Sequence, residues 1–155
     1  MGRLAGIARH AGPRAPMEEL SRASVTVEAG VAGDGRGTTL RMKGRQVALI
    51  ELESWNAAMA ELGLSGDEAL PWYVRRANLL VEGLRLPRDY GHVIAIGDDC
   101  RIETTMECDP CRRMDEIRPG LRQALEPDWR GGVLGVVLSD GKIAVGDEVR
   151  ILGNP

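Results

Sequence analysis

The sequence predicts a mainly β protein, a compact β-barrel with a few short helices. Several short segments alternate apolar and polar residues, glycine-rich turns separate them, and one stretch has a clear helical period. With 20 glycines, no phenylalanine and 3% aromatic residues, the core must consist mainly of Val, Leu, Ile, Ala and Met. A chain of 155 residues suits one core, so we expect a single domain over residues 1–155.

Three strands are predicted in the first third of the chain. They are expected at Arg3–Arg9, Ser24–Ala29 and Arg45–Glu51. Branched and polar residues alternate in the second of these, and the third is expected to bury Val47 and Leu49. The segment 30–37 between the second and third strands is a glycine-rich loop. These turns and short strands are typical of a barrel.

The period changes after this third strand, and the sequence predicts a helix. Trp55, Met59 and Leu62 fall on one helical face. Ser54 is the expected N-cap and Gly63 the expected end, because serine caps helix N-termini and glycine adopts the left-handed conformation that ends helices.

The second half of the chain returns to strands. Pro119-Gly120 is expected to interrupt short helical turns between Met114 and Leu125. Asp140-Gly141 is a hairpin signal between two strands. The predicted strands of this half are residues 78–83, 92–97, 100–107, 132–138, 142–145 and 148–152.

Composition excludes several classes of function. The 20 basic and 23 acidic residues give a net charge of −3, whereas a non-specific nucleic-acid binder normally has a clear basic excess. No apolar run is long enough to cross a membrane, and the N-terminus lacks the apolar segment of a secretory signal. We therefore expect a cytoplasmic protein that binds a small molecule rather than nucleic acid or a membrane. Its three cysteines then indicate thiol or metal chemistry rather than disulfides.

Two of the cysteines lie in the stretch MECDPCRRMDE, residues 106–116. A zinc site would need further ligands such as His92 and Cys100, because there is no second C-x-x-C pair. A thioredoxin-like redox pair would need a βαβ context, and a nucleobase deaminase would need P-C-x-x-C with H-x-E. Zinc thus remains an alternative, and the deaminase is excluded.

The chemistry of the three thiols is expected to differ. Cys100 lies in a predicted strand and suits a small core residue. Cys111 follows Pro110 and precedes Arg112 and Arg113, and nearby cations lower the pKa of a thiol and favour the reactive thiolate. These arginines are equally typical of a solvated surface, so the residues alone leave the role of Cys111 open.

Five ordered segments resemble the molybdenum cofactor sulfurase C-terminal domain, or MOSC, family. The segments are GVAGD (30–34), RQVALIE (45–51), RRANLLVEG (75–83), the DPC ending at Cys111, and GGVLGVVLSDGKIAVGDEV (131–149). The resemblance covers nearly the whole chain and implies a free-standing, single-domain member with a β-rich barrel. It also implies binding of the molybdenum cofactor, a pterin dithiolene that carries molybdenum and a phosphate.

The resemblance implies a set of site residues. Cys111 matches the family's conserved cysteine, which is implicated as a molybdenum ligand or sulfur carrier, and thiolate suits such a centre. Cys108 has no such general counterpart in the family, so its role is open. Arginine forks suit the cofactor's phosphate. Asp34 matches the family's G-D turn, where it is equally typical of a residue that satisfies backbone N–H groups. The implied cofactor-binding residues are Arg45, Arg76, Asn78, Arg130 and Asp34.

The resemblance favours an enzyme, either a sulfur transferase or a small molybdenum-dependent oxidoreductase acting through Cys111. Reduction of N-hydroxylated substrates is one activity of the family. Full sulfurases also contain a pyridoxal-phosphate cysteine desulfurase, which does not fit in 155 residues. Pyridoxal phosphate would therefore enter only through a separate desulfurase, and a separate reductase is the corresponding partner for an oxidoreductase. The alternatives are a non-catalytic module for cofactor binding or delivery, and a Cys/His zinc-binding barrel.

Overall fold

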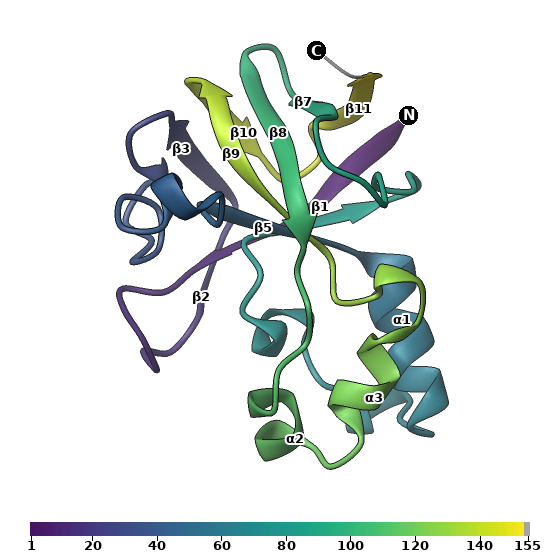
Figure 1. Ribbon diagram of the computed structural model, residues 1–155. Coiled ribbons are helices and arrows are strands. Elements are labelled where there is room, and N and C mark those ends of the chain that lie inside the picture. The colour runs from purple at the N-terminus through teal and green to yellow at the C-terminus, as the bar shows by residue number, and fades with distance from the viewer. Residues whose placement is uncertain (154–155) are drawn as a thin grey trace.

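A closed barrel forms the centre of the molecule in the computed structural model, which describes residues 1–153 (Figure 1). Seven strands pair in the order β1-β11-β7-β8-β9-β5-β6 and back to β1, and β2 extends the sheet beside β1. This confirms the predicted β-barrel. The strands are β1 Gly2–Arg9, β2 Glu18–Leu20, β5 Val47–Glu51, β6 Leu79–Glu82, β7 Val93–Ile96, β8 Cys100–Glu107, β9 Val133–Ser139 and β11 Glu148–Gly153.

A second, three-stranded sheet packs beside the barrel. It contains β3 (Arg22–Thr26), β4 (Gly30–Val31) and β10 (Gly141–Ala144), in the order β10-β3-β4. The predicted Asp140-Gly141 hairpin is therefore wrong, because β10 pairs with β3 and not with β9. The Asp140 carboxylate instead accepts a hydrogen bond from the backbone N–H of Val27, at 2.7 Å, which turns the chain toward the second sheet.

The helices lie at one end of the barrel (Figure 1). β5 and β6 are parallel neighbours, so the chain between them must cross over, and this crossover contains α1. Met114 and Leu125 lie in two short helices separated at Pro119-Gly120, as predicted. The helices are α1 Leu52–Glu61, α2 Arg113–Ile117 and α3 Leu121–Leu125, with short 3-10 turns at Arg41–Lys43, Gly66–Glu68, Trp72–Arg75 and Pro127–Trp129. Within residues 1–153, no helix has the length and apolar character that a membrane crossing requires.

The N-terminus of α1 differs from the prediction. Helix α1 begins at Leu52, so Ser54 lies inside it and is not the N-cap. The Ser54 hydroxyl donates a hydrogen bond to the Glu51 carboxylate at 3.0 Å, and this carboxylate also accepts from the backbone N–H of Leu86. Glu51 occupies the N-cap position, but its side chain does not cap a helix N–H; the buried carboxylate instead joins α1 to the chain that follows β6.

Strand β5 is buried on both faces. Val47 and Leu49 pack inside the barrel, whereas Ala48 and Ile50 pack against the helices. A strand that lies between two cores must carry apolar side chains on both of its faces. The strand thus connects the barrel core to the helical core.

Candidate functional site

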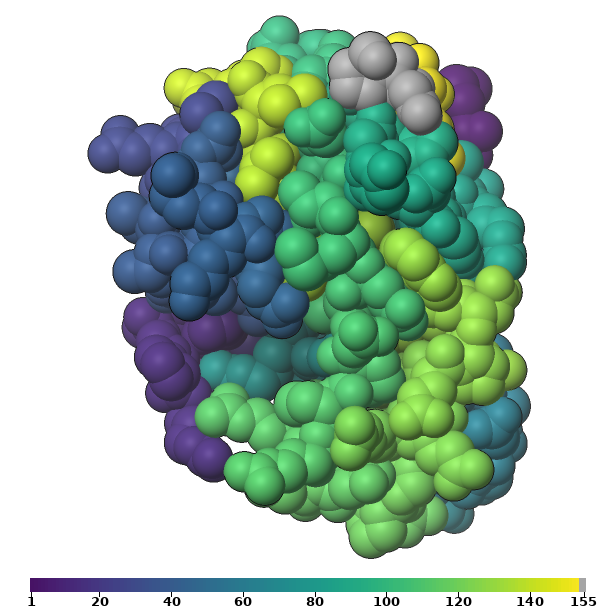
Figure 2. Space-filling model, viewed as in Figure 1, coloured from purple at the N-terminus to yellow at the C-terminus, as the bar shows by residue number. Residues whose placement is uncertain are grey.

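A pocket of about 470 Å³ lies at the end of the barrel nearer the helices. Its walls come from five parts of the chain. These are the turn after β1, the glycine-rich loop with the segment after it, the 3-10 turn at Trp72–Arg75 with the residue that follows, the extended chain from β8 to α2, and one leucine of β9. Figure 2 shows its surroundings as a recess between the purple N-terminal loop and the green chain around α2. The lining residues used below are His10, Arg36, Arg45, Arg75, Arg76, Cys108, Asp109, Cys111, Arg113 and Met114.

The glycine-rich loop is fixed against the barrel by one buried side chain. The Gln46 amide donates hydrogen bonds to the carbonyl oxygens of Gly37, at 3.0 Å, and Val27, at 2.9 Å. A Cβ at Gly37 would lie 1.6 Å from the carbonyl oxygen of Ala29, so a larger residue does not fit there. This close packing holds Arg36 at the pocket wall.

The two cysteines of the C-x-x-C stretch line the pocket in different ways. Cys111 is exposed, whereas Cys108 is 9% exposed. The buried Arg75 guanidinium donates to the Cys108 sulfur at 3.2 Å and to the Cys108 carbonyl oxygen at 2.7 Å. Cys111 therefore lies at the mouth of the pocket and Cys108 in its inner wall.

The third cysteine belongs to the core. Cys100 is fully buried in the barrel interior and does not line the pocket. Burial raises the pKa of its thiol to about 12, so it is a poor nucleophile near neutral pH. The position agrees with the role expected from the sequence.

Positive charge is concentrated around the pocket. Five arginines line it, against one carboxylate, that of Asp109. Burial lowers the pKa of Arg36, and the charges of Arg75 and Arg45 lower it further, although Asp34 and Cys108 oppose this. Such mutual repulsion between guanidinium groups favours an anionic ligand.

Asp34 lies behind the pocket wall rather than in it. Its carboxylate accepts hydrogen bonds from the backbone N–H groups of His10, at 3.0 Å, and Arg36, at 3.3 Å. Its side chain is 1% exposed. These contacts match the turn role considered from the sequence, and they position the two residues that face the pocket.

His10 has one ring nitrogen with a partner and one without. Its Nδ1 lies 2.9 Å from the carbonyl oxygen of Gly12, which favours the tautomer with the proton on Nδ1. Its Nε2 is buried without a hydrogen-bond partner, 3.9 Å from the Asp34 carboxylate. Burial lowers the pKa of His10 despite the nearby carboxylate, so the ring is neutral near pH 7.

The structure brings together three of the six predicted site residues. Cys111, Arg45 and Arg76 line the pocket. Asn78 is fully buried: its side chain accepts from the N–H of Ala48 at 3.0 Å and donates to the carbonyl oxygen of Ala8 at 3.2 Å. It therefore ties β5 to β1 behind the pocket.

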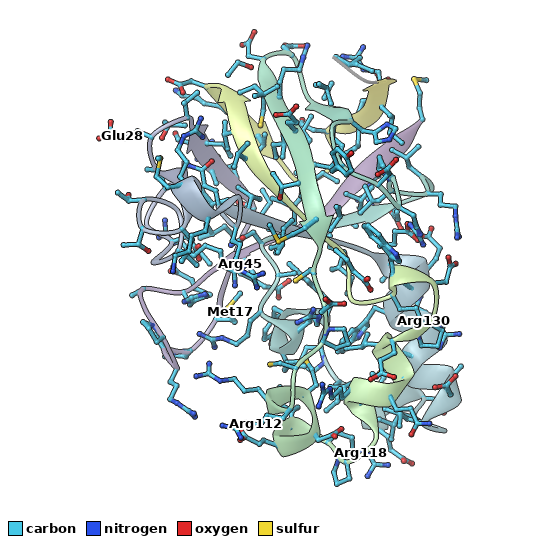
Figure 3. The ribbon with its side chains drawn as sticks, viewed as in Figure 1. Met17, Glu28, Arg45, Arg112, Arg118 and Arg130 are labelled. Atoms are coloured by element: carbon cyan, nitrogen blue, oxygen red, sulfur yellow. The ribbon has the colours of Figure 1, made fainter. Side chains whose placement is uncertain are left out.

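Arg130 lies apart from the pocket. It pairs with Glu61 at 3.1 Å and donates to the carbonyl oxygen of Ala124 at 3.0 Å. Figure 3 shows Arg45 below the barrel and Arg130 beside α3, in different parts of the molecule. Its predicted role in cofactor binding stays a prediction, without support from this geometry.

Sequence reasoning missed several lining residues. Arg36 and Arg75 carried no motif of their own, and the role of Cys108 was left open. Arg113 lines the pocket, but its neighbour Arg112 does not. The signal was present as adjacent arginine pairs in RRANL and CRRM, but a pair does not indicate whether one or both members line the pocket: both do in the first pair and one does in the second.

The described residues do not gather a conventional metal cluster. Across residues 1–153, no group of three or more His, Cys, Asp or Glu side chains could hold a metal ion. The zinc alternative needed Cys108 and Cys111 beside Cys100 and His92, but Cys100 faces the barrel core. A larger hollow of about 1200 Å³ lies against β3 and β10, yet it contains no cysteine. The thiol chemistry therefore belongs to the smaller pocket.

Comparisons with known proteins agree with the barrel fold. The family model for the MOSC domain matches residues 9–150. The YuaD protein from Bacillus subtilis has a TM-score of 0.75 at 18% identity, over 97% of this chain and 96% of that chain. YiiM from Escherichia coli has a TM-score of 0.70 at 15% identity, over 99% of this chain and 71% of that chain. YiiM from Geobacillus stearothermophilus has a TM-score of 0.71 at 13% identity, over 98% of this chain and 75% of that chain. No curated protein matches the sequence significantly.

Proposed function

Because the chain belongs to the MOSC domain family, whose model covers residues 9–150, we propose that it binds the molybdenum cofactor in the thiol–arginine pocket. The family is associated with molybdenum-cofactor function. The observation that carries the proposal is the gathering of five arginines and two cysteines around one pocket of about 470 Å³. A pocket of roughly 300–1,000 Å³ is the usual size for a small organic ligand.

The lining fits the chemistry of this cofactor. Arg45 and Arg76 bring guanidinium groups to the pocket, and a guanidinium binds phosphate through two directed hydrogen bonds, which a lysine cannot do. The Arg76 guanidinium also donates to the carbonyl oxygen of Ala15 at 2.7 Å, which fixes its position. The exposed Cys111 offers a soft sulfur ligand. The cofactor would bring dithiolene sulfur of its own to the metal, so the chain would need to add only a ligand such as Cys111.

We assign supporting roles to two predicted residues. Asp34 holds the backbone of His10 and Arg36 in place, and Asn78 holds β5 against β1. Neither side chain lines the pocket, and both support its walls through hydrogen bonds to the backbone. Cys111, Arg45 and Arg76 are the residues proposed to touch the cofactor.

Two reactions follow from a thiolate at this position. Cys111 carries sulfur delivered by a separate pyridoxal-phosphate cysteine desulfurase, or it holds the cofactor for reduction of N-hydroxylated substrates with electrons from a separate reductase. The bound cofactor would supply a metal centre that accepts sulfur or exchanges electrons. The chain's own contribution is to hold the phosphate and to keep the Cys111 sulfur accessible.

A non-catalytic delivery module is the second candidate. The exposure of Cys111 at the mouth of the pocket favours it, since a thiolate at the surface can pass its ligand to another protein. This candidate predicts cofactor binding without turnover. The oxidoreductase predicts turnover of N-hydroxylated compounds once a reductant is supplied.

The test is metal and pterin analysis of the protein purified from a molybdenum-replete host. We expect molybdenum and pterin in near-equal amounts in the wild type. Cys111→Ser should lower molybdenum content, and Arg45→Gln should lower the content of both. Stoichiometric zinc without molybdenum or pterin would overturn the proposal in favour of a zinc-binding barrel.

Arg130→Gln is the matched control for Arg45→Gln. Both are arginine substitutions, but Arg130 pairs with Glu61 away from the pocket. The control variant should retain wild-type amounts of molybdenum and pterin. Equal loss in both variants would mean that general charge, rather than the pocket, determines retention.

A further inference from the structure

The inner wall of the pocket contains a buried positive charge without a carboxylate partner. Arg75 is 7% exposed. Among residues 1–153, no Asp or Glu lies within ion-pair distance of it. A buried guanidinium without an anion is costly. Its contacts are two backbone carbonyl oxygens and the sulfur atoms of Cys108 and Met114.

The Cys108 sulfur is placed to supply the missing negative charge. It lies 3.2 Å from Arg75 Nη2, and the backbone N–H of Cys108 donates to the carbonyl oxygen of Gly132 at 2.9 Å. Arg75 Nε donates to the carbonyl oxygen of Gly131 at 3.1 Å. Arginine, cysteine and the chain that leads into β9 therefore form one fixed unit, in which the guanidinium donates directly to the Cys108 sulfur.

We propose that Cys108 is a second reactive thiolate, which accepts sulfur from a persulfide on Cys111 and moves it into the pocket. The inference rests on the proposed sulfur-carrier role of Cys111. Both cysteines line the same pocket, and residues three apart are within about 10 Å even in an extended chain. The exposed Cys111 receives sulfur at the mouth, and Cys108 holds it beside the arginines.

The transfer is a thiol exchange that balances without an added oxidant or reductant. The Cys108 thiolate attacks the outer sulfur of the Cys111 persulfide. A sulfur–sulfur bond forms at Cys108 as the one at Cys111 breaks, and the Cys111 sulfur leaves as a thiolate with the bonding electron pair. The proton on the outer sulfur travels with it, so one thiolate is consumed and one is produced.

The test uses the protein free of cofactor and inorganic polysulfide as the sulfur donor. Samples are quenched with an alkylating agent at short times, digested with trypsin and analysed by mass spectrometry. Residues 102–112 form one tryptic peptide, and fragmentation at the Asp109–Pro110 bond separates the two cysteines. In the wild type, the added sulfur should appear first on Cys111 and then on Cys108. The core thiol of Cys100 is an internal control that should stay unmodified.

Three variants determine the order of the steps. Cys108→Ser should leave the sulfur on Cys111, and Cys111→Ser should slow the loading of Cys108 by about ten-fold or more. Arg75→Gln should slow transfer to Cys108 by about ten-fold without slowing the loading of Cys111. The two cysteine variants decide the question by themselves if Arg75→Gln does not fold.

Two results would overturn the inference. In the first, Cys108 gains sulfur as fast in Cys111→Ser as in the wild type, which would mean that polysulfide reaches Cys108 directly. In the second, Cys108 stays as unreactive toward sulfur as Cys100. Neither result bears on cofactor binding, which is measured by metal and pterin content without polysulfide. Failure of cofactor binding with sulfur transfer intact would reject the proposed cofactor and keep the two-cysteine transfer.

Discussion

Replacement of Asn78 by alanine separates a structural role from a cofactor-binding role. The variant removes the bond that Asn78 accepts from the N–H of Ala48 and the bond it donates to the carbonyl oxygen of Ala8. Both backbone groups would be left buried without these partners, at about 1–3 kcal/mol each. Asn78→Ala should therefore lower the free energy of unfolding by about 2–6 kcal/mol, a large share of the 5–15 kcal/mol typical of a domain.

Urea unfolding followed by circular dichroism measures this loss. With a slope of about 2 kcal/mol per molar urea, the midpoint should fall by roughly 1–3 M. Asn56→Ala, an exposed asparagine on α1, is the matched control and should shift the unfolding free energy by about 0.5 kcal/mol or less. A midpoint for Asn78→Ala equal to that of the control, combined with lost cofactor, would refute the structural role and restore Asn78 as a ligand contact.

Three further predictions concern pH and packing. Burial lowers the pKa of His10, so the unfolded chain protonates first and stability should fall as pH drops below about 6.5. His10→Gln should weaken this dependence in urea titrations, and an unchanged dependence in that variant would contradict the prediction. Burial raises the pKa of Cys100 to about 12, so stability should fall above about pH 9, by up to about 1.4 kcal/mol per pH unit; an unchanged slope in Cys100→Ala would contradict this. In Gly131→Ala, a Cβ would lie 2.6 Å from the Cys108 carbonyl oxygen, so we expect the free energy of unfolding to fall by about 1–3 kcal/mol and Cys108 to be alkylated faster. An alkylation rate equal to that of the wild type would show that the pocket wall tolerates the methyl group.

The strands were predictable because their signals are local. The alternation in CRIETTME predicted β8 with its actual bounds, Cys100–Glu107. Strand β5 was predicted too, but the burial of its second face became visible only in the structure. The errors arose where distant residues decide the structure. Asp140 is bound by the N–H of Val27, more than a hundred residues away, so the Asp-Gly pair does not close a hairpin. Helix α1 begins at Leu52, so Ser54 lies inside it and bonds the buried Glu51 carboxylate, which also accepts from the distant Leu86 N–H.

The site was predictable to a smaller extent. The resemblance led to Cys111, Arg45 and Arg76, which share the pocket. It could not predict that the Asn78 side chain would bond backbone groups of β5 and β1 instead of a ligand. It also could not indicate Cys108, whose importance comes from Arg75, a residue 33 positions away in the sequence. A spacing such as C-x-x-C shows that two thiols are near each other along the chain, but not which charge each one meets after folding.

The closure of the barrel has a consequence for the order in which the protein is built. The closing pair joins Gly2 to Val149, whereas the pocket lining runs from His10 to Leu134. During synthesis, every lining residue leaves the ribosome before the strand that completes the barrel, since chains emerge N-terminus first. A ligand present before the barrel closes would meet the lining residues on a sheet that is still open. A ligand that arrives later must pass the mouth beside Cys111, so the time of loading determines the route of entry.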